Sequence, residues 1–221
     1  MMKPLILFLI LAPLLPAAAG DPSVVERWFQ ATSTASSVEV VFSQKRILKT
    51  IKLPIKNEGK LWIDYAEDRF RWQTGDPPQT IVLRVGTELT IIRTPGKRYE
   101  IRDLTQKSGA EERVKPKSGM TVLAGGFPRT LEAFEKQYRV LETKFEDGLH
   151  RVITKPLDAR GESVHEFVFL IDADSFFLRG FEIELEDGSS IEMVFDEVTP
   201  NVELNDGLFE HDLTGHKEVE F

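Results

Sequence analysis

Two short stretches, Gly59-Lys60-Leu61-Trp62-Ile63 and Arg69-Phe70-Arg71-Trp72, decide what kind of fold this chain adopts. Successive side chains of a β-strand point to opposite faces, so the two aromatic residues of the second stretch share one face and its two arginines lie on the other. A sheet with one strongly aromatic face must bury that face against a second sheet, a helix or a ligand. The pair therefore predicts neighbouring strands of a sheet with one apolar side.

Alternating apolar and polar residues continue around these stretches, over about 37–101 and again over 138–198. Turn-forming residues separate the alternating runs, and Asp147-Gly148 and Asp187-Gly188 are strong hairpin signals. We count ten or eleven antiparallel strands, with no linker or repeat that would divide them. So long a series favours one domain built on a strongly curled sheet or barrel, which is wide enough to hold a ligand.

Two short helices are predicted outside the strands. Residues 21–31 combine a capping Asp21 with an apolar stripe that includes Trp28. Residues 130–135 begin with a capping threonine and have an apolar side that includes Phe134. Each helix therefore has one face that must be covered by another part of the protein.

The N-terminus has the features of an export signal. Lys3 precedes an apolar run over 5–15, and Ala17-Ala18-Ala19 follow it. A basic start, a short apolar core and small residues at the end are typical of a cleavable signal peptide, and a membrane-spanning helix would need roughly 20 apolar residues. We expect a signal peptide over 1–19 and a single mature domain over 20–221 in the bacterial periplasm. A retained membrane anchor is the alternative.

The composition narrows the possible functions. The chain has no cysteine, which excludes disulfides, thiol catalysis, thiolate metal sites and the lipid-attachment cysteine of a bacterial lipoprotein. It contains 28 Lys and Arg against 36 Asp and Glu, and loss of Lys3 with the signal leaves 27 against 36, a net charge of −9. Nucleic acid and anionic membrane surfaces are poor partners for that charge.

No residue pattern typical of an enzyme or a metal site is present in the sequence. The four histidines, none of which has a partner at metal-ligand spacing, are His150, His165, His211 and His216. Two aspartate pairs, Asp172 with Asp174 and Asp64 with Asp68, lie at predicted turns, where aspartate commonly bonds to nearby backbone. We therefore expect neither catalysis nor a cofactor or metal.

Apolar side chains exceed what the packing of a sheet requires. Phenylalanine alone accounts for 15 residues, many at alternating strand positions. One interpretation is a filled β-sandwich core. The other is a cavity lined for an apolar ligand, which a large curled sheet would favour.

A series of short stretches, in their order along the chain, resembles the LolA family of periplasmic lipoprotein carriers. The matching stretches, which extend over most of the mature chain, are Phe42-Ser43-Gln44, Gly59-Lys60-Leu61-Trp62, Phe70-Arg71-Trp72, Pro77 with Gln79-Thr80-Ile81-Val82, Gly86-Thr87-Glu88-Leu89 and Asn205-Asp206-Gly207-Leu208-Phe209. The resemblance implies a mainly β fold, a half-open antiparallel β-barrel of about eleven strands with helices covering its mouth. It also implies a non-enzymatic carrier, which we expect to be a monomer. Such a carrier receives acylated lipoproteins or lipids from an inner-membrane ABC transporter, shields their acyl chains and delivers them to an outer-membrane acceptor.

The strand and helix patterns, together with the resemblance, predict which residues face the ligand; the resemblance itself points to Phe70, Trp72, Met120, Val122 and Leu123. The expected cavity residues are Phe42, Leu61, Ile63, Phe70, Trp72, Ile81, Leu89, Ile91, Met120, Val122 and Leu123, and the expected lid residues are Trp28 and Phe134. Members of the family often carry an arginine shortly after the L-W-x segment, which ties the lid shut. Here that segment reads Asp64-Tyr65-Ala66-Glu67-Asp68, and the next arginine is Arg69. Contact between the lid helices should therefore depend mainly on apolar burial.

Three functions remain open from the sequence, with hydrolase activity a distant fourth. The first is a carrier of lipidated proteins. The second is a carrier of free lipid or glycolipid with the same fold, and the third is a periplasmic binding or sensing domain with a small, filled interior. Lipid in an organic extract of the purified protein would distinguish the carriers from the third.

Overall fold

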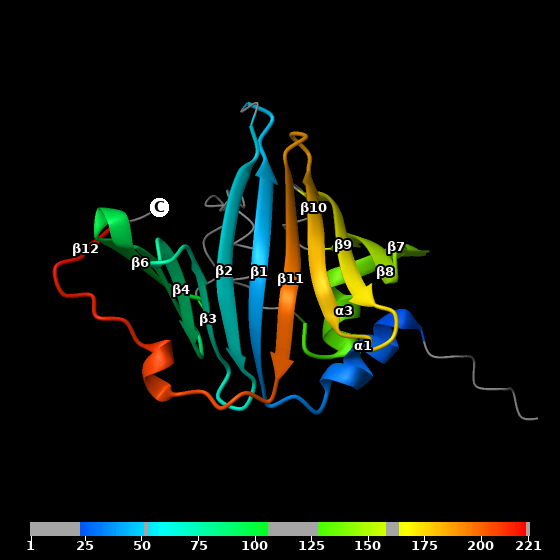
Figure 1. Ribbon diagram of the computed structural model, residues 1–221, viewed down its shortest axis with the longest axis horizontal. Helices are drawn as coiled ribbons and strands as arrows, with labels where there is room; N and C mark the ends of the chain where they lie inside the picture. The colour runs from blue at the N-terminus through cyan, green and yellow to red at the C-terminus, as the bar shows by residue number, and fades with distance from the viewer. Residues whose placement is uncertain (1–22, 51–52, 106–127, 158–163, 220–221) are drawn as a thin grey trace, which may run out of the picture.

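The computed structural model describes residues 23–50, 53–105, 128–157 and 164–219. A single sheet dominates it, with the strand order β12-β6-β5-β4-β3-β2-β1-β11-β10-β9-β8-β7 (Figure 1). The strands are β1 (Ser37–Ile47), β2 (Ile55–Asp64), β3 (Arg69–Thr74), β4 (Thr80–Val85), β5 (Glu88–Arg93), β6 (Arg98–Asp103), β7 (Tyr138–Glu146), β8 (Leu149–Pro156), β9 (Val164–Asp172), β10 (Leu178–Leu185), β11 (Ser190–Pro200) and β12 (Lys217–Glu218). No helix in these ranges is long and apolar enough to cross a membrane.

The sheet is curled and open. Strands β1 to β6 form one antiparallel meander and β7 to β11 another, and the pairing of β1 with β11 joins the two halves. Strands β12 and β7 are the two edges and do not pair with each other, so the sheet does not close into a barrel. This architecture agrees with a half-open barrel. The predicted strands correspond to β1 to β11, whereas the two-residue β12, which pairs in parallel with β6, is too short to show an alternation.

The turn predicted at Asp147-Gly148 is confirmed. Both residues have positive φ angles, 52° and 78°, and they connect β7 to β8. This is the backbone conformation that lets a two-residue turn follow the twist of the flanking strands. Gly188, with φ 81°, closes the corresponding turn between β10 and β11.

The glycine of the deciding stretch is required by close packing. Gly59 lies opposite Phe42 in the β1–β2 register, and a Cβ atom at Gly59 would lie 2.6 Å from Cζ of Phe42 and 2.1 Å from the carbonyl oxygen of Gln73. The Phe42 ring stacks on Trp72, with centroids 5.6 Å apart and an angle of 10° between the planes. The absence of a side chain at Gly59 thus lets an aromatic ring lie flat against the sheet.

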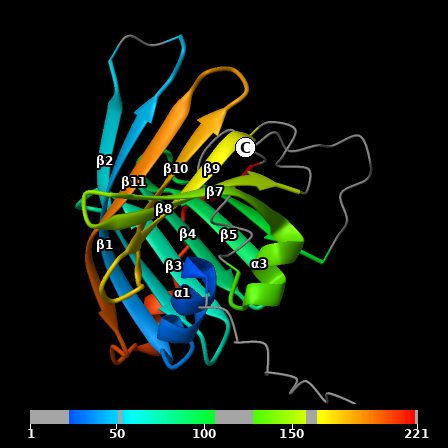
Figure 2. The ribbon, with the colours of Figure 1, turned by 90° about the vertical axis from the view of Figure 1, so that its right-hand side faces the viewer.

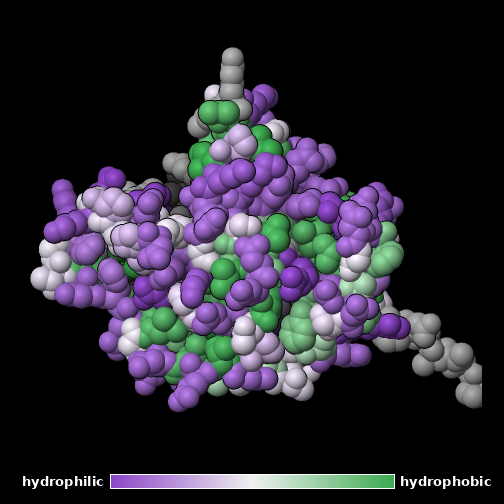
Figure 3. Space-filling model, viewed as in Figure 1, coloured by the Kyte–Doolittle hydropathy of each residue, from purple (hydrophilic) through white to green (hydrophobic). Residues whose placement is uncertain are grey.

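The two faces of the sheet have different coverings. The inner face of the curl carries the main core, to which the two helices α1 (Val24–Thr32) and α3 (Leu131–Gln137) contribute (Figure 2). Figure 3 looks onto the outer face of the central strands, where hydrophilic side chains predominate. This distribution is the polar-out, apolar-in pattern expected of a one-sided sheet.

The helices begin at side-chain caps. The N-cap of α1 is Ser23, whose hydroxyl accepts a hydrogen bond from the Glu26 amide, while the Glu26 carboxylate accepts one from the Ser23 amide. This capping box corrects the expected start at residue 21. Thr130 caps α3 as predicted, by accepting a hydrogen bond from the Ala133 amide at 3.1 Å.

The expectation that helices cover the mouth of the barrel is not confirmed. Among the described residues, α1 and α3 contact each other and pack on the inner face, next to β8 and β7 respectively. The expected cavity residues Met120, Val122 and Leu123 lie outside the described residues.

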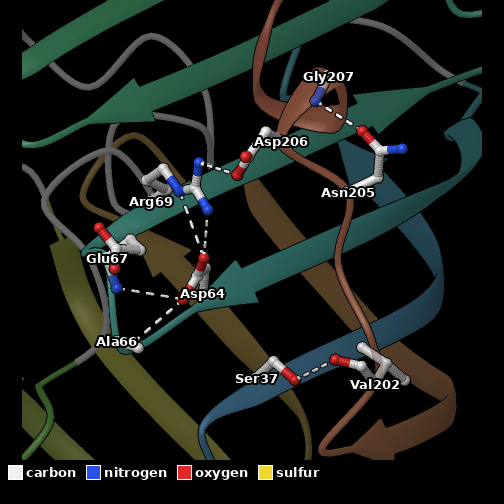
Figure 4. A network of polar contacts seen from close by, with 9 residues as sticks. All are labelled: Ser37, Asp64, Ala66, Glu67, Arg69, Val202, Asn205, Asp206 and Gly207. Carbon is white, nitrogen blue, oxygen red and sulfur yellow. Dashed lines mark hydrogen bonds and ion pairs between the residues drawn. The ribbon is translucent and has the colours of Figure 1, made fainter.

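Arg69 holds the C-terminal segment on the outer face (Figure 4). Its guanidinium pairs with Asp64 at 2.7 Å and with Asp206 at 3.0 Å. It also lies 4.6 Å from the ring centroid of Phe209, in the short helix η3 (Asp206–Phe209). The neighbouring Arg71 donates a hydrogen bond to the carbonyl oxygen of Leu208 at 2.9 Å. The first arginine after the L-W-x segment therefore fixes a strap across the outside of the sheet.

Candidate functional site

A pocket of about 120 Å³ lies between α1 and the central strands. Its lining residues are Trp28, Phe29, Thr32, Ser33, Ala35, Val38, Val40, Leu61, Ile63, Tyr65, Pro128, Arg129, Phe177, Leu178, Phe195 and Val198. Most of these side chains are aliphatic or aromatic, and one is charged. The pocket therefore suits an apolar group with a polar end.

Cross-strand pairs build the floor of the pocket. Val40 on β1 lies opposite Leu61 on β2, and Val38 lies opposite Ile63, so all four side chains project from one face. On the other side of β1, Val40 lies opposite Val198 of β11. Three adjacent strands thus present one continuous apolar surface.

A β-bulge enlarges this floor. The pairing of β1 with β11 shifts register between Val41 and Phe42, because Val41 lies opposite Glu197 while Phe42 lies opposite Phe195. Asp196 is the extra residue, so Phe195 and Val198 both line the pocket although strict alternation would place residues three apart on opposite faces. The bulge adds an aromatic ring to the apolar surface.

Helix α1 forms the wall of the pocket. Trp28 and Phe29 stack with their ring centroids 4.6 Å apart. Thr32 and Ser33 add hydroxyl groups, but these donate hydrogen bonds within the helix, to the carbonyl oxygens of Trp28 at 3.0 Å and Gln30 at 2.8 Å. The wall consequently offers apolar surface and no unengaged hydroxyl proton.

Tyr65 and Arg129 form the polar edge of the pocket. The Arg129 guanidinium lies 4.8 Å from the centroid of the Tyr65 ring, and Arg129 is exposed to solvent. Burial raises the pKa of the Tyr65 phenol, and the positive charge of Arg129 partly opposes this increase. The phenol is therefore neutral at physiological pH and keeps its proton.

Apart from Ile81, the expected cavity and lid residues fall into three groups. Leu61, Ile63 and the lid residue Trp28 line the pocket. Residues of the second group are buried in the core around the pocket without lining it; they are Phe42, Phe70, Trp72, Leu89, Ile91 and the lid residue Phe134. The third group, Met120, Val122 and Leu123, lies outside the described residues.

The expectation that Ile81 lines the cavity is corrected by the register. Ile81 lies opposite Gln73 and Ile92, whereas its neighbour Val82 lies opposite the core residue Trp72. Ile81 therefore belongs to the outer face, where it clusters with Leu83, Ile92, Tyr99 and Leu213. Strand β4 is buried on both faces, so its run of apolar residues does not indicate which of them face the pocket.

Several lining residues were not expected from the sequence. Val38 and Val40 could have been found, because they alternate on the same face as Phe42. Tyr65, Arg129 and Phe177 lie in connecting segments, where no periodicity indicates a direction. They meet at the pocket only through the tertiary fold.

The carboxylate pairs are parts of turns, as predicted. Hydrogen bonds from the Ser175 amide and hydroxyl, and from the Asp174 amide, hold the pKa of Asp172 below its ordinary value. Asp64 likewise accepts hydrogen bonds from Ala66, Glu67 and Arg69. Within the described ranges, no three His, Cys, Asp or Glu side chains are placed to hold a metal ion.

Comparison with known proteins places the chain in a family. The family model described as "Outer membrane lipoprotein carrier protein LolA" matches residues 33–212. An uncharacterized conserved protein from Thermus thermophilus is similar in structure, with a TM-score of 0.54 and 7% identity over 89% of this chain and 96% of that one. A DUF1329 family protein from Desulfovibrio piger has a TM-score of 0.51 and 13% identity over 85% and 95% of the respective chains. Comparison with curated protein sequences found no match. At such identities the two structures support the fold alone, and the family match over most of the chain shows that this protein belongs to the LolA family.

Proposed function

We propose that this protein is a periplasmic carrier that shields the acyl chains of lipoproteins during transfer from the inner to the outer membrane. The observation that carries the proposal is the apolar pocket between α1 and strands β1, β2 and β11. Membership in the LolA family supports it. On this proposal the donor is an inner-membrane ABC transporter, and the recipient is an outer-membrane acceptor.

Acyl chains need such a shield because their transfer into water is costly. Each methylene group removed from water contributes about 0.8 kcal/mol. The floor and wall of the pocket provide apolar contacts from Leu61, Ile63 and Trp28. A carrier that uses such contacts can bind chains of different length, because they are non-directional.

Loading requires the pocket to enlarge. A cavity of about 150 Å³ in another protein holds a single benzene molecule, so the 120 Å³ here accommodates only part of an acyl chain. Helix α1 is the wall best able to move. Among the described residues, its side chains form no hydrogen bond or ion pair with the sheet, and its contacts with rings outside the helix are with Phe134, Phe169 and Phe176.

Binding of the apolar fluorophore N-phenyl-1-naphthylamine tests the proposal. Ile63→Glu should abolish binding while the circular dichroism spectrum stays unchanged, because Ile63 is half-buried at the pocket and a charge there costs several kcal/mol to desolvate. Val194→Glu is the matched control, since Val194 is 48% exposed on β11 next to the inward-facing Phe195. Equal binding by both variants would refute the pocket as the site.

A carrier of free lipid is the second candidate, favoured by the polar edge at Tyr65 and Arg129. Mass spectrometry of material extracted from the purified protein distinguishes the lipoprotein carrier from the free-lipid carrier. Acylated peptides support the lipoprotein carrier, and free lipids without peptide support the alternative.

A further inference from the structure

The polar edge of the pocket offers hydrogen-bond donors but no carboxylate. Arg129 is the one charged residue among those that line the pocket. Within the described ranges its guanidinium has no hydrogen-bond or ion-pair partner, and its contact is with the Tyr65 ring. A cation left without a counter-ion beside an apolar surface is an attractive place for an anion.

Tyr65 supplies a second donor at the same edge. Its hydroxyl has no hydrogen-bond partner among the described residues, and burial keeps the phenol protonated by raising its pKa. The other hydroxyl groups of the pocket, on Thr32 and Ser33, already donate to carbonyl oxygens of α1. The guanidinium of Arg129 and the hydroxyl of Tyr65 therefore place two unengaged donors together, at the end of the pocket where solvent reaches Arg129.

We propose that the pocket binds an amphiphile whose anionic group, a carboxylate or a phosphate, lies next to its acyl chain. The chain would contact the floor formed by Leu61 and Ile63, and the anionic oxygens would accept hydrogen bonds from Arg129 and Tyr65. A neutral or cationic head group would leave the guanidinium unpaired. This inference rests on the proposed binding of acyl chains and adds selection of the cargo by charge. It favours the free-lipid carrier as the function of the pocket, because the acylated cysteine of a lipoprotein has only neutral ester and amide groups next to its chains.

Displacement of N-phenyl-1-naphthylamine by two ligands with the same chain tests this selection. Dodecanoate should displace the probe at a concentration about fivefold lower than 1-monododecanoylglycerol, the effect expected for a solvent-exposed charge pair. Arg129→Gln should remove that preference and leave the affinity for the neutral ligand unchanged. Tyr65→Phe should reduce the preference in part, because it removes one donor and keeps the ring.

Arg139→Gln is the matched control for loss of one positive charge. Arg139 is exposed on β7 and does not line the pocket, and its guanidinium has no hydrogen-bond or ion-pair partner among the described residues. This variant should retain the full preference for dodecanoate. A preference lost equally in Arg139→Gln would show a general field effect and overturn the inference.

A second pair of ligands separates the two anionic groups. Lysophosphatidylglycerol and lysophosphatidylcholine with dodecanoyl chains share a phosphate, but only the first has a net charge. If the protein prefers the anionic ligand in both pairs, it recognises either anionic group. If it prefers only dodecanoate over its neutral partner, the recognised group is the carboxylate. If it prefers only lysophosphatidylglycerol over lysophosphatidylcholine, the recognised group is the phosphate. If no ligand displaces the probe, acyl-chain binding itself fails. If all displace it equally, or if Arg129→Gln weakens all equally, the selection by charge is refuted while the carrier function stands.

Discussion

Replacing Phe134 with leucine should loosen α1 while the strands keep their protection. Phe134 is 1% exposed and joins α1 to the rest of the core. Its ring lies 6.0 Å from that of Trp28 and 5.9 Å from that of Phe29, both on α1, and 5.4 Å from Phe169 on β9. Leucine keeps most of the apolar area but removes these aromatic pairs.

The size of the expected change in the free energy that opens α1 follows from the two aromatic contacts that Phe134 makes with this helix. An aromatic pair contributes about 0.5–1.5 kcal/mol beyond its buried area, so the free energy that opens α1 should fall by about 1–3 kcal/mol. Because 1.4 kcal/mol corresponds to a factor of ten, the amides of α1 should exchange roughly 5–150 times faster. The reduced cost of opening should also strengthen binding of an acyl chain, since more of the protein is ready to accept it.

Hydrogen exchange followed by mass spectrometry measures this effect peptide by peptide. Ile92→Val is the control, because Ile92 is fully buried in the outer cluster and the change costs about 0.5–1.5 kcal/mol. It should lower global stability without selective exchange in α1. Equal acceleration in α1 and in the central strands of Phe134→Leu would refute the idea of an independently opening wall.

Three further predictions concern packing, pH and processing. Gly59→Ala should destabilise the protein by about 1–3 kcal/mol in urea denaturation, because the added methyl group would overlap the Gln73 carbonyl. Gly207→Ala is the control and should cost less than about 0.5 kcal/mol, so equal effects of the two changes would contradict the packing argument. Burial raises the pKa of Asp64, but hydrogen bonds from Arg69 and from backbone amides outweigh it, so the folded pKa is lowered. The stability that Asp64 contributes is present above the ordinary carboxylate pKa and is lost as pH falls through the lowered value. Asp64→Asn should therefore reduce the free energy of unfolding at pH 7 and flatten the acid limb of its pH profile. N-terminal sequencing of periplasmic protein should begin at Gly20, and an intact N-terminus in the membrane fraction would contradict export by a cleaved signal.

The sequence predicted the fold well where one rule of alternation applied. Phe42 and Trp72 share the inner face because every second residue of a half-buried strand does so, and the register confirms the neighbouring strands. Ile81 was misplaced because β4 is buried on both sides and shows no alternation to read. The start of α1 differed because Asp21 and Ser23 are both acceptable caps, and only the reciprocal bond with Glu26 decides between them.

The site was less predictable than the fold. Leu61 and Ile63 follow from the strand pattern, but Tyr65 and Arg129 are far apart in the sequence and belong to loops. Their contact depends on where the tertiary fold brings the segment before α3 to the turn after β2, which periodicity does not describe. The polar chemistry of the pocket is therefore a property of the tertiary structure.

Photolabelling tests the central claim, that an acyl chain lies between α1 and the central strands, most directly. A fatty acid with a diazirine in its chain would be bound, activated by light and located by mass spectrometry of the digested protein. Labels are expected on the peptides that contain Trp28, Leu61 and Ile63, with competition by unlabelled fatty acid. Labels confined to the outer cluster around Leu83 and Leu213, or no label that unlabelled fatty acid removes, would contradict the claim.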